Sequence, residues 1–182
     1  MMIIMICLTT ILKKWQWLIV IGVFLFLYFL VNGIFSIYRK KKVVATLTRF
    51  CDNKGYRLII GKRATYDYII KTNEKNFYIK TVYVPLNAAI TINSKDTWNL
   101  TYGGAHNRPG RGYSRQRYLD ELKDFLRKDF NGVKLVLIYP HIDKVQKYLN
   151  ESEIAILSYI EVAYGIRFMT YRDWESHFSD LI

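Results

Sequence analysis

Residues 15–38 read WQWLIVIGVFLFLYFLVNGIFSIY, a run of 24 positions that carries no formal charge. As a helix at ~1.5 Å per residue this run is about 36 Å long, enough to cross a hydrocarbon core of ~30 Å with some tilt. Trp15, Trp17 and Tyr38 lie near its ends, where amphipathic rings favour the headgroup layer. A buried helix of a soluble protein would need a large domain around it, and only about 140 residues follow. The run therefore predicts a transmembrane helix.

The charges beside this run predict its orientation. Lys13 and Lys14 precede it, whereas four basic residues, Arg39–Lys42, follow it directly. Because Lys and Arg collect on the cytoplasmic side of a span, we expect 39–182 to form a cytoplasmic domain. No A-x-A-like cleavage site follows the apolar run, so we expect an uncleaved anchor and not a signal peptide. Residues 1–14 are apolar but too short to span, and we expect them to pack on the membrane surface.

The composition of 39–182 limits what this domain can be. All 15 Asp and Glu lie after residue 42, against 21 of the 27 Lys and Arg, so residues 43–182 carry a net charge of +6. Attraction to anionic lipid, contact with nucleic acid and a solvated surface all fit this mild basicity. Two cysteines, Cys7 and Cys51, cannot build a disulfide framework or a cysteine-based zinc site. His106, His141 and His177 show no metal-ligand spacing.

Hydrophobic periodicity and turn residues predict an α/β domain with one mixed sheet flanked by helices. The predicted helices lie at 39–52, 114–130, 142–149, from Asn150 past Ile160, and 171–181. The predicted strands lie at 56–61, 65–71, 77–84, 133–139 and 166–170, with small additional strands at 90–92 and 98–102. We expect Gly55 to end the first helix and Ser114 to cap the second. The strand at 133–139 follows a helix, so we expect it to run parallel to an earlier strand.

Three short segments carry a pattern of polar residues within this order of elements. They are Tyr66-Asp67-Tyr68-Ile69-Ile70 on the second strand, Phe77-Tyr78-Ile79-Lys80 on the third, and Gln116 at the start of the following helix. With the order helix–β–β–β–helix–β, they resemble the restriction-endonuclease-like (PD-(D/E)xK) superfamily, and within it the membrane-anchored nuclease-related domains. The resemblance covers about 43–140, and it implies an αβββαβ core after the membrane helix.

The resemblance implies that Asp67 is a metal ligand and that Lys80 and Gln116 are catalytic residues. In the family two carboxylates hold Mg²⁺, and the metal and the lysine orient a water and stabilise charge on the phosphate. The second carboxylate stands two positions before the lysine, on the same face of the strand. Here that position is Tyr78, whose phenol, with a pKa of about 10, is a poor Mg²⁺ ligand. The sequence thus predicts a weakened or absent metal site, with Mg²⁺ as cofactor only if the domain is active.

Ordinary structural roles remain open for all three residues. Asp67 can end a hydrogen-bond network, Lys80 can be a charge on an edge strand, and Gln116 can be solvated in a first helical turn.

The segment 106–117, HNRPGRGYSRQR, is a second candidate site. It contains four arginines, whose guanidinium groups match phosphate geometry: Arg108, Arg111, Arg115 and Arg117. Tyr113 and Trp98 are predicted to stack on bases. A solvated loop or a patch that contacts anionic lipid is the alternative.

Three functions fit these observations. The first is a non-catalytic, degenerate nuclease-like domain that associates with DNA or RNA at a membrane. The second is an active Mg²⁺-dependent nuclease. The third is a non-enzymatic membrane interaction or assembly protein that keeps the fold as a scaffold.

Overall fold

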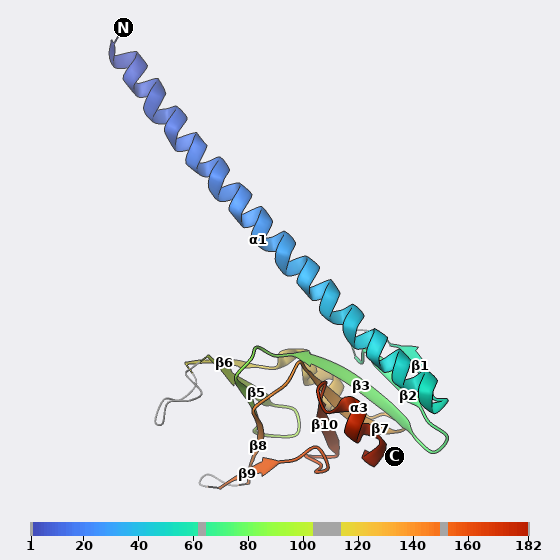
Figure 1. The fold of residues 1–182 in the computed structure, drawn as a ribbon. Coiled ribbons are helices and arrows are strands. Elements are labelled where there is room, and N and C mark those ends of the chain that lie inside the picture. Colours follow the sequence, from blue (N-terminus) through green and yellow to red (C-terminus); the bar gives the residue numbers. More distant parts are fainter. Residues whose placement is uncertain (1, 62–64, 104–113, 150–152, 182) are drawn as a thin grey trace. The chain divides into compact units, whose positions relative to one another are not determined.

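The computed structural model describes residues 2–61, 65–103, 114–149 and 153–181, with side chains from residue 17 onward. Contacts divide the chain into two units, 1–46 and 47–182. Helix α1 (Met2–Lys54) is one unbroken helix (Figure 1), so the predicted continuation of the apolar run into 39–52 is confirmed. It ends where predicted, because Gly55 takes the left-handed conformation (φ 70°) that glycine adopts without strain.

The apolar part of α1 has the length and composition that crossing a membrane requires. Its side chains are exposed from Trp17 to Phe35. Within the described residues, α1 from Trp17 onward is the one helix whose length and composition allow it to cross a membrane. A long apolar N-terminal helix is therefore a feature of the structure as well as of the sequence.

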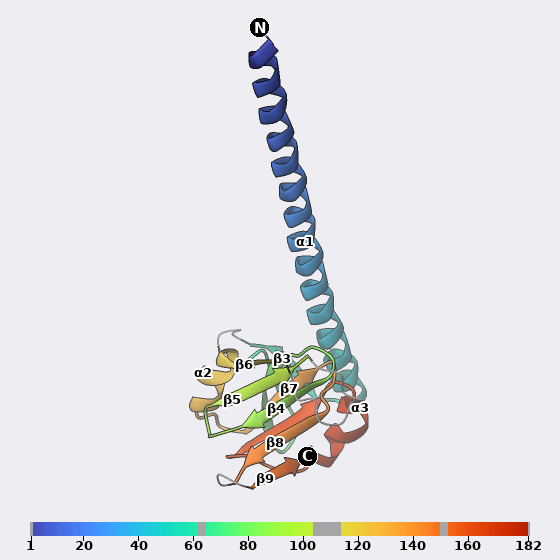
Figure 2. The same cartoon turned by 90° about the vertical axis from the view of Figure 1, so that its left-hand side faces the viewer.

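The second unit contains ten strands in two mixed, five-stranded sheets, counted over the described residues (Figure 2). The first sheet has the order β1-β2-β3-β7-β10, with β1 Arg57–Ile60, β2 Tyr68–Lys71, β3 Asn76–Tyr83, β7 Val133–Tyr139 and β10 Ile166–Thr170. The second has the order β6-β5-β4-β8-β9, with β6 Arg115–Tyr118, β5 Trp98–Tyr102, β4 Ala88–Ile92, β8 Lys144–Tyr148 and β9 Ile154–Leu157. As predicted, β7 pairs in parallel with an earlier strand, β3.

The two sheets meet at a corner that both parallel pairs turn. β3 leads into β4 and β7 leads into β8, and β4 pairs in parallel with β8 as β3 does with β7. Pro85 and Pro140 lie in the two connections, where their missing N–H groups interrupt the ladders. The N–H of Val84 donates to the carbonyl of Tyr139 at 2.9 Å, which carries the pairing into the corner.

The main core lies between the two sheets. Val82, Val136 and Ile138 of the first sheet and Ile90 and Leu100 of the second belong to one buried cluster. The short helices η1 (Asp120–Leu122) and α2 (Lys123–Arg127) add Leu122, Phe125 and Leu126 to this cluster.

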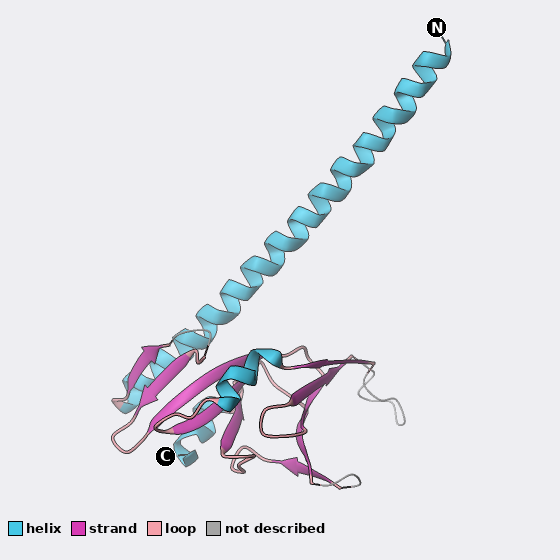
Figure 3. Cartoon of the chain, turned by 180° about the vertical axis from the view of Figure 1, so that it is seen from behind, coloured by secondary structure: helices cyan, strands magenta, loops and turns pink. Residues whose placement is uncertain are grey.

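A second apolar layer involves α3 (Trp174–His177) and η2 (Phe178–Leu181). The ring of Phe178 packs against Phe77 of β3 at 5.0 Å, against Phe50 at 5.2 Å and against Trp174 at 4.3 Å. The predicted closing helix at 171–181 is thus present as two short helical turns that bury Trp174, Phe178 and Leu181. Strands dominate this unit, and its helices are short (Figure 3).

Three predicted helices are wrong. Residues 114–130 begin with strand β6 and contain only the short η1 and α2, so Ser114 caps no helix. The predicted helix at 142–149 is strand β8, and the one from Asn150 past Ile160 contains strand β9. Asn150 itself lies outside the described residues. β6 pairs with β5, as at Gln116 and Thr101, β8 pairs with β4, and β9 pairs with β8, and these strand pairings override local helical periodicity.

The predicted strands agree better with the structure. Those at 90–92, 98–102, 133–139 and 166–170 are confirmed as parts of β4, β5, β7 and β10. The single predicted sheet is replaced by two, because the misassigned segments supply the edge strands β6 and β9 of the second sheet.

Candidate functional site

The structure brings Asp67 and Lys80 together. Asp67 directly precedes β2, and since Tyr68 pairs with Ile79, the next position on β3, Lys80, lies opposite Asp67. The Nζ atom of Lys80 is 3.6 Å from Oδ1 of Asp67, and their side chains are 9% and 21% exposed. The backbone N–H of Thr81 donates to Oδ2 of Asp67 at 2.8 Å. Both carboxylate oxygens therefore have partners within the domain.

The hairpin between β2 and β3 fixes this geometry. The hydroxyl of Thr72 accepts hydrogen bonds from the N–H groups of Glu74 and Lys75, at 3.3 and 3.1 Å, and closes the turn. Glu74 is exposed in this turn, whereas Asp67 lies before the opposite end of β2. Four strand residues at ~3.4 Å each separate them by about 13 Å, so Glu74 is not placed to share a metal with Asp67.

The position that the resemblance assigns to the second carboxylate holds an aromatic side chain, Tyr78. The ring of Tyr78 stacks on Phe130 at 4.6 Å and meets the edge of Tyr66 at 5.5 Å. Phe130 in turn contacts Phe125 of α2 at 5.5 Å, so Tyr78 belongs to a cluster that extends into the core. Across the described ranges, no three His, Cys, Asp or Glu side chains gather as metal ligands do.

Lys134 is a buried cation near this cluster that the sequence analysis did not select. It lies opposite Tyr78 on β7, and its Nζ donates to the carbonyl of Leu126 at 2.9 Å, near the end of α2. Burial lowers the pKa of Lys134, and the carboxylate of Asp129, 3.8 Å away, opposes this shift. The available signal was a single lysine inside the apolar run at 133–139, which must find an acceptor if the strand is covered. Its bond to α2 indicates a structural role.

Gln116 lies in the other sheet. It is exposed on β6, opposite Thr101 of β5, whereas Asp67 and Lys80 belong to the β2–β3 hairpin of the first sheet. Since β6 is a strand, Gln116 does not stand at a helix start, the position for which the resemblance selected it.

The arginine-rich segment is described only in part. Arg108, Arg111 and Tyr113 lie outside the described residues, whereas Arg115 and Arg117 are exposed on β6. Two nitrogens of Arg117 donate to the two carboxylate oxygens of Glu121, at 2.9 and 3.1 Å.

The residues that flank 104–113 are held together. The N–H and the hydroxyl of Ser114 both donate to the carbonyl of Gly103, at 2.5 and 2.7 Å. Next to them, Tyr102 of β5 pairs with Arg115 of β6. Residues 104–113, which include Arg108 and Arg111, thus connect two paired strands.

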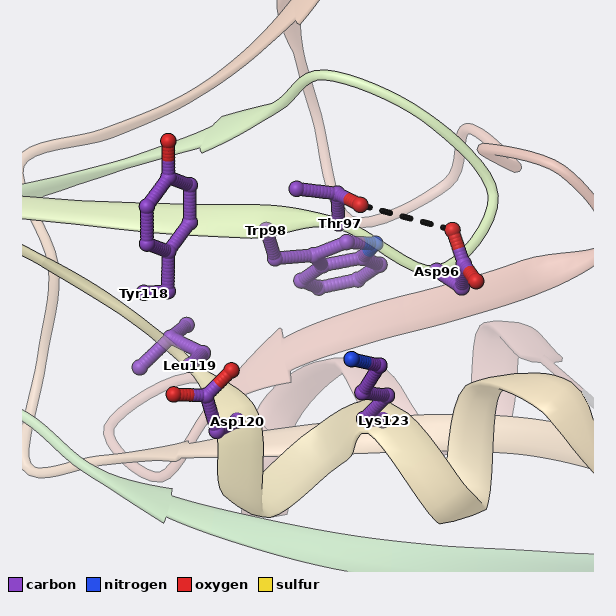
Figure 4. A pocket seen from close by; sticks show the side chains of 7 residues that line it. All are labelled: Asp96, Thr97, Trp98, Tyr118, Leu119, Asp120 and Lys123. Atoms are coloured by element: carbon purple, nitrogen blue, oxygen red, sulfur yellow. Dashed lines mark hydrogen bonds between the residues drawn. The ribbon is translucent and has the colours of Figure 1, made fainter.

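Trp98 is not placed to stack on bases. The residue is 1% exposed and lines a groove together with Tyr118, Asp96, Asp120 and Lys123 (Figure 4). A ring covered to this extent offers no free face to a nucleobase, so this part of the prediction is wrong. Tyr118, which is 60% exposed and follows Arg117 on β6, is the better stacking candidate. The sequence analysis missed it because it placed Tyr118 inside the predicted helix at 114–130.

Asp96, which lines this groove, is held in an ion pair with Arg127. The guanidinium of Arg127 donates to Asp96 at 2.7 Å, and together with Ser94 it lowers the pKa of Asp96. Asp96 is thus bound to α2 and is not free to act as a second carboxylate beside Asp67.

The candidate site consists of one carboxylate–lysine pair, an aromatic ring at the position that the resemblance assigns to the second ligand, and a separate basic edge strand with an exposed tyrosine. Comparisons of the chain with protein-family models, with curated proteins and with solved structures give no match.

Proposed function

We propose that this chain is a single-span membrane protein whose cytoplasmic domain has an endonuclease-like core, has a degenerate metal site, and binds nucleic acid through its basic β5–β6 edge. The observation that carries the proposal is the Asp67–Lys80 pair, kept in contact while an aromatic ring fills the place of the second carboxylate.

The order of elements in the first sheet supports an endonuclease-like core. Helix α1 precedes β1, β2 and β3, and α2 precedes β7, which pairs in parallel with β3. Strands β4, β5 and β6 are then an insertion between β3 and α2 that builds the second sheet and carries Arg115 and Arg117.

The surroundings of Asp67 favour a structural role over catalysis. A catalytic carboxylate of this family needs a partner that shares its metal, and Tyr78 cannot supply one because its ring packs between Tyr66 and Phe130. Asp67 instead accepts the N–H of Thr81 and neutralises a buried ammonium group. The pair keeps the aspartate and the lysine that the resemblance implies side by side, but it lacks the second carboxylate that a metal site of this kind needs.

An active Mg²⁺-dependent nuclease is the second candidate, because Asp67 and Lys80 do face each other. One carboxylate leaves most of the coordination sphere of Mg²⁺ to water and substrate phosphate. A cleavage assay with variants of these two residues separates the candidates and is described in the Discussion.

Reversing the charge of the basic edge strand β6 and of the two arginines that precede it in the sequence is expected to abolish nucleic-acid binding. With Arg108, Arg111, Arg115 and Arg117 replaced by glutamate, the full chain should lose measurable affinity for a labelled oligonucleotide at low salt. Each phosphate contact contributes about 0.9 to the slope of log affinity against log salt, so reversing one arginine at a time should lower the slope by about one. Electrophoretic mobility shift across a salt series measures both quantities.

A matched control makes the same change in net charge elsewhere in the domain. Lys54, Arg57, Lys71 and Lys75 are exposed basic residues on α1, on the β1–β2 pair and in the adjoining turn. Replacing these four with glutamate should lower affinity several-fold less than the change in the basic edge. Equal losses in both variants, or no binding by the unmodified chain at low salt, would remove this part of the proposal.

The proposed anchor predicts that the chain behaves as an integral membrane protein. The full chain should float with lipid vesicles and stay with them after alkaline extraction. Aspartate at both Leu25 and Phe26 should release it, because each charge at a span centre costs about 2.5–3.5 kcal/mol of insertion free energy. Aspartate at Leu86, an exposed apolar residue of the domain, is the control. Release of the unmodified chain by alkali would contradict the anchor.

A further inference from the structure

One of the four edge strands in the described sheets lacks a charged side chain. Three edges contain an arginine: β1 has Arg57, β10 has Arg167, and β6 has Arg115 and Arg117. The fourth, β9, reads Ile154-Ala155-Ile156-Leu157. Proteins that stay monomeric usually place charges or prolines on exposed edges, because the unpaired backbone of a bare edge pairs readily with another strand. The edge at β9 has neither.

The hydrogen-bonding groups of β9 are arranged to accept a partner strand. The N–H of Leu149 donates to the carbonyl of Glu153 at 3.0 Å, and Lys147 lies opposite Ala155 in the ladder. Because hydrogen-bonded pairs alternate along an antiparallel ladder, Ala155 uses its backbone groups toward β8. The N–H and carbonyl groups of Ile154 and Ile156 therefore point away from β8, toward the open edge.

The side chains next to this edge are apolar and exposed. Ile154 and Ile156 are 48% and 68% exposed, and Tyr148 of β8, opposite Ile154, is 43% exposed. These three side chains lie on the same face of the second sheet, since residues opposite each other and residues two apart share a face. A bare edge and an adjoining apolar strip thus occur at one place.

We propose that β9 pairs with β9 of a second copy of this chain, antiparallel and about a two-fold axis that passes beside Ala155. This register places Ile154 opposite Ile156 of the partner subunit, and Ala155 opposite its own copy. Both isoleucines of each strand then exchange backbone hydrogen bonds, which gives four bonds across the axis. A shift by one residue is excluded, because it would turn the apolar strip of one copy to the opposite face from that of the other.

Self-complementarity favours a second copy over an unrelated strand. The two residues whose backbone groups point toward the open edge, Ile154 and Ile156, are identical and lie symmetrically about Ala155. Each strand therefore offers the other the same hydrogen-bond donors and acceptors, as an isologous contact requires. Because β9 contains no charged residue, the pairing of two copies brings no like charges together. The neighbouring N–H of Ser158 already donates to Glu161 at 2.5 Å, which limits the free ladder to Ile154–Leu157.

The proposed strand pair is only four residues long, so we expect it to form only where the local concentration of the chain is high. Stable soluble dimers bury about 1,200–2,000 Å², more than a four-residue strand pair provides, so the contact needs a high local concentration. Confinement of the chain to a membrane supplies that concentration, and in this respect the inference rests on the proposed anchor. We expect a weak dimer at a membrane surface and monomers in dilute detergent.

Disulfide cross-linking of the full chain in lipid vesicles tests this arrangement. Ala155→Cys places two thiols at a non-hydrogen-bonded antiparallel pair, where Cα atoms lie about 4.5 Å apart, within the range that a disulfide accepts. Cys7 is replaced by serine beforehand. Cys51 can stay, because burial and the adjacent Asp52 raise the pKa of its thiol to about 11 and leave little reactive thiolate. Mild oxidation of Ala155→Cys should give a disulfide-linked dimer.

Two further cysteine variants measure the background rate of disulfide cross-linking. Ile154→Cys lies on the same strand, but in this register its copy is offset by two residues, beyond the Cα separation of about 7 Å that a disulfide tolerates. Asn99→Cys lies on β5 of the same sheet, away from the β9 edge. Ala155→Cys should cross-link about tenfold faster than either. Adding Ile156→Lys, a charge at an exposed edge position, should reduce that rate to the background.

Two results would overturn the proposal. One is equal cross-linking at 99, 154 and 155, which indicates random collision. The other is cross-linking at 155 that Ile156→Lys does not change. Flotation of each sample with its vesicles is scored separately, so a chain that fails to anchor is distinguished from an anchored chain whose β9 strands do not pair.

Discussion

Replacing Asp67 with alanine is expected to lower the free energy of unfolding by about 2–4 kcal/mol. The change removes the counter-ion of Lys80, whose side chain is 9% exposed, and removes the acceptor of the Thr81 N–H. Breaking a buried ion pair from one side costs about 3–5 kcal/mol, and the partial exposure of Asp67 places the expected loss at or below the lower part of that range. Denaturant unfolding of the full chain in detergent, followed by near-ultraviolet circular dichroism, measures the change.

A double-mutant cycle tests whether the loss comes from this pair. Removing both charges, in Asp67→Ala with Lys80→Met, should cost less than the two single changes added together, since neither charge is then left without the other. Additive losses would contradict a coupled pair. Asp67→Asn is the milder control, because its side-chain oxygen can still accept the N–H of Thr81.

The same variants decide between a structural and a catalytic pair. If the site is degenerate, Mg²⁺-dependent release of labelled fragments from DNA or RNA should be the same for the unmodified chain, for Asp67→Ala and for Lys80→Ala. Cleavage by the unmodified chain that falls by orders of magnitude in both variants would establish the nuclease instead. Variants that remain folded by circular dichroism are required for this comparison.

Replacing Trp174 with alanine is expected to cost about 3–5 kcal/mol of unfolding free energy, the usual loss for a large aromatic side chain deleted from a core. Trp174 is completely buried, stacks on Phe178 at 4.3 Å and meets Phe50 edge-on at 5.9 Å. Its removal opens a cavity between the first sheet and the C-terminal turns. The same denaturant measurement applies, with loss of the native near-ultraviolet signal as the readout.

Trp174→Phe is the matched control for this change. The indole Nε1 of Trp174 is buried and has no acceptor among the described protein atoms. Phenylalanine therefore keeps an aromatic ring in the layer and deletes a donor that forms no bond within it, so the loss should be clearly smaller than for alanine. Tyr118→Ala, at an exposed ring, should change stability by less than about 0.5 kcal/mol. A loss for Trp174→Ala no larger than this would contradict the packing described for the layer.

The elements that the sequence predicted correctly are those whose signal is local. The uncharged run at 15–38, Gly55 after the first helix, and the apolar strand at 133–139 each depend on composition or turn chemistry within a few residues. The strands at 90–92 and 98–102 were also found, because β-branched and aromatic residues cluster there. Local patterns of this kind predicted most of the first sheet.

The errors lie where an amphipathic segment suits either a helix or a strand. Lys144-Val145-Gln146-Lys147-Tyr148 has apolar residues at a spacing that fits one helical face, yet it pairs with β4 and β9. Such short segments take the conformation that satisfies their backbone groups, and one of the partners here, β4, is distant in sequence. The same limit applies to Trp98, since its burial depends on η1 and α2, which the sequence analysis had merged into one longer helix.

The candidate site was predicted in part for the same reason. Asp67 and Lys80 meet because a two-strand hairpin fixes their register, and the hairpin is a local feature. Tyr118 and Lys134 were missed, because their environments depend on the second sheet and on α2. The environment of each residue depends on contacts with other elements, and the sequence pattern of a single strand does not reveal such contacts.

The parallel pairing of β3 with β7 and of β4 with β8 has a consequence for synthesis of the chain. Phe77 pairs with Val133, and Ala89 with Lys144, so the inner edges of β3 and β4 gain their partners only after a long stretch has been translated. At about 5–20 residues per second, the nascent domain exposes two apolar strand edges for several seconds. Non-local pairing of this kind also slows folding, so we expect newly made chains to depend on chaperones until β7 and β8 have emerged from the ribosome.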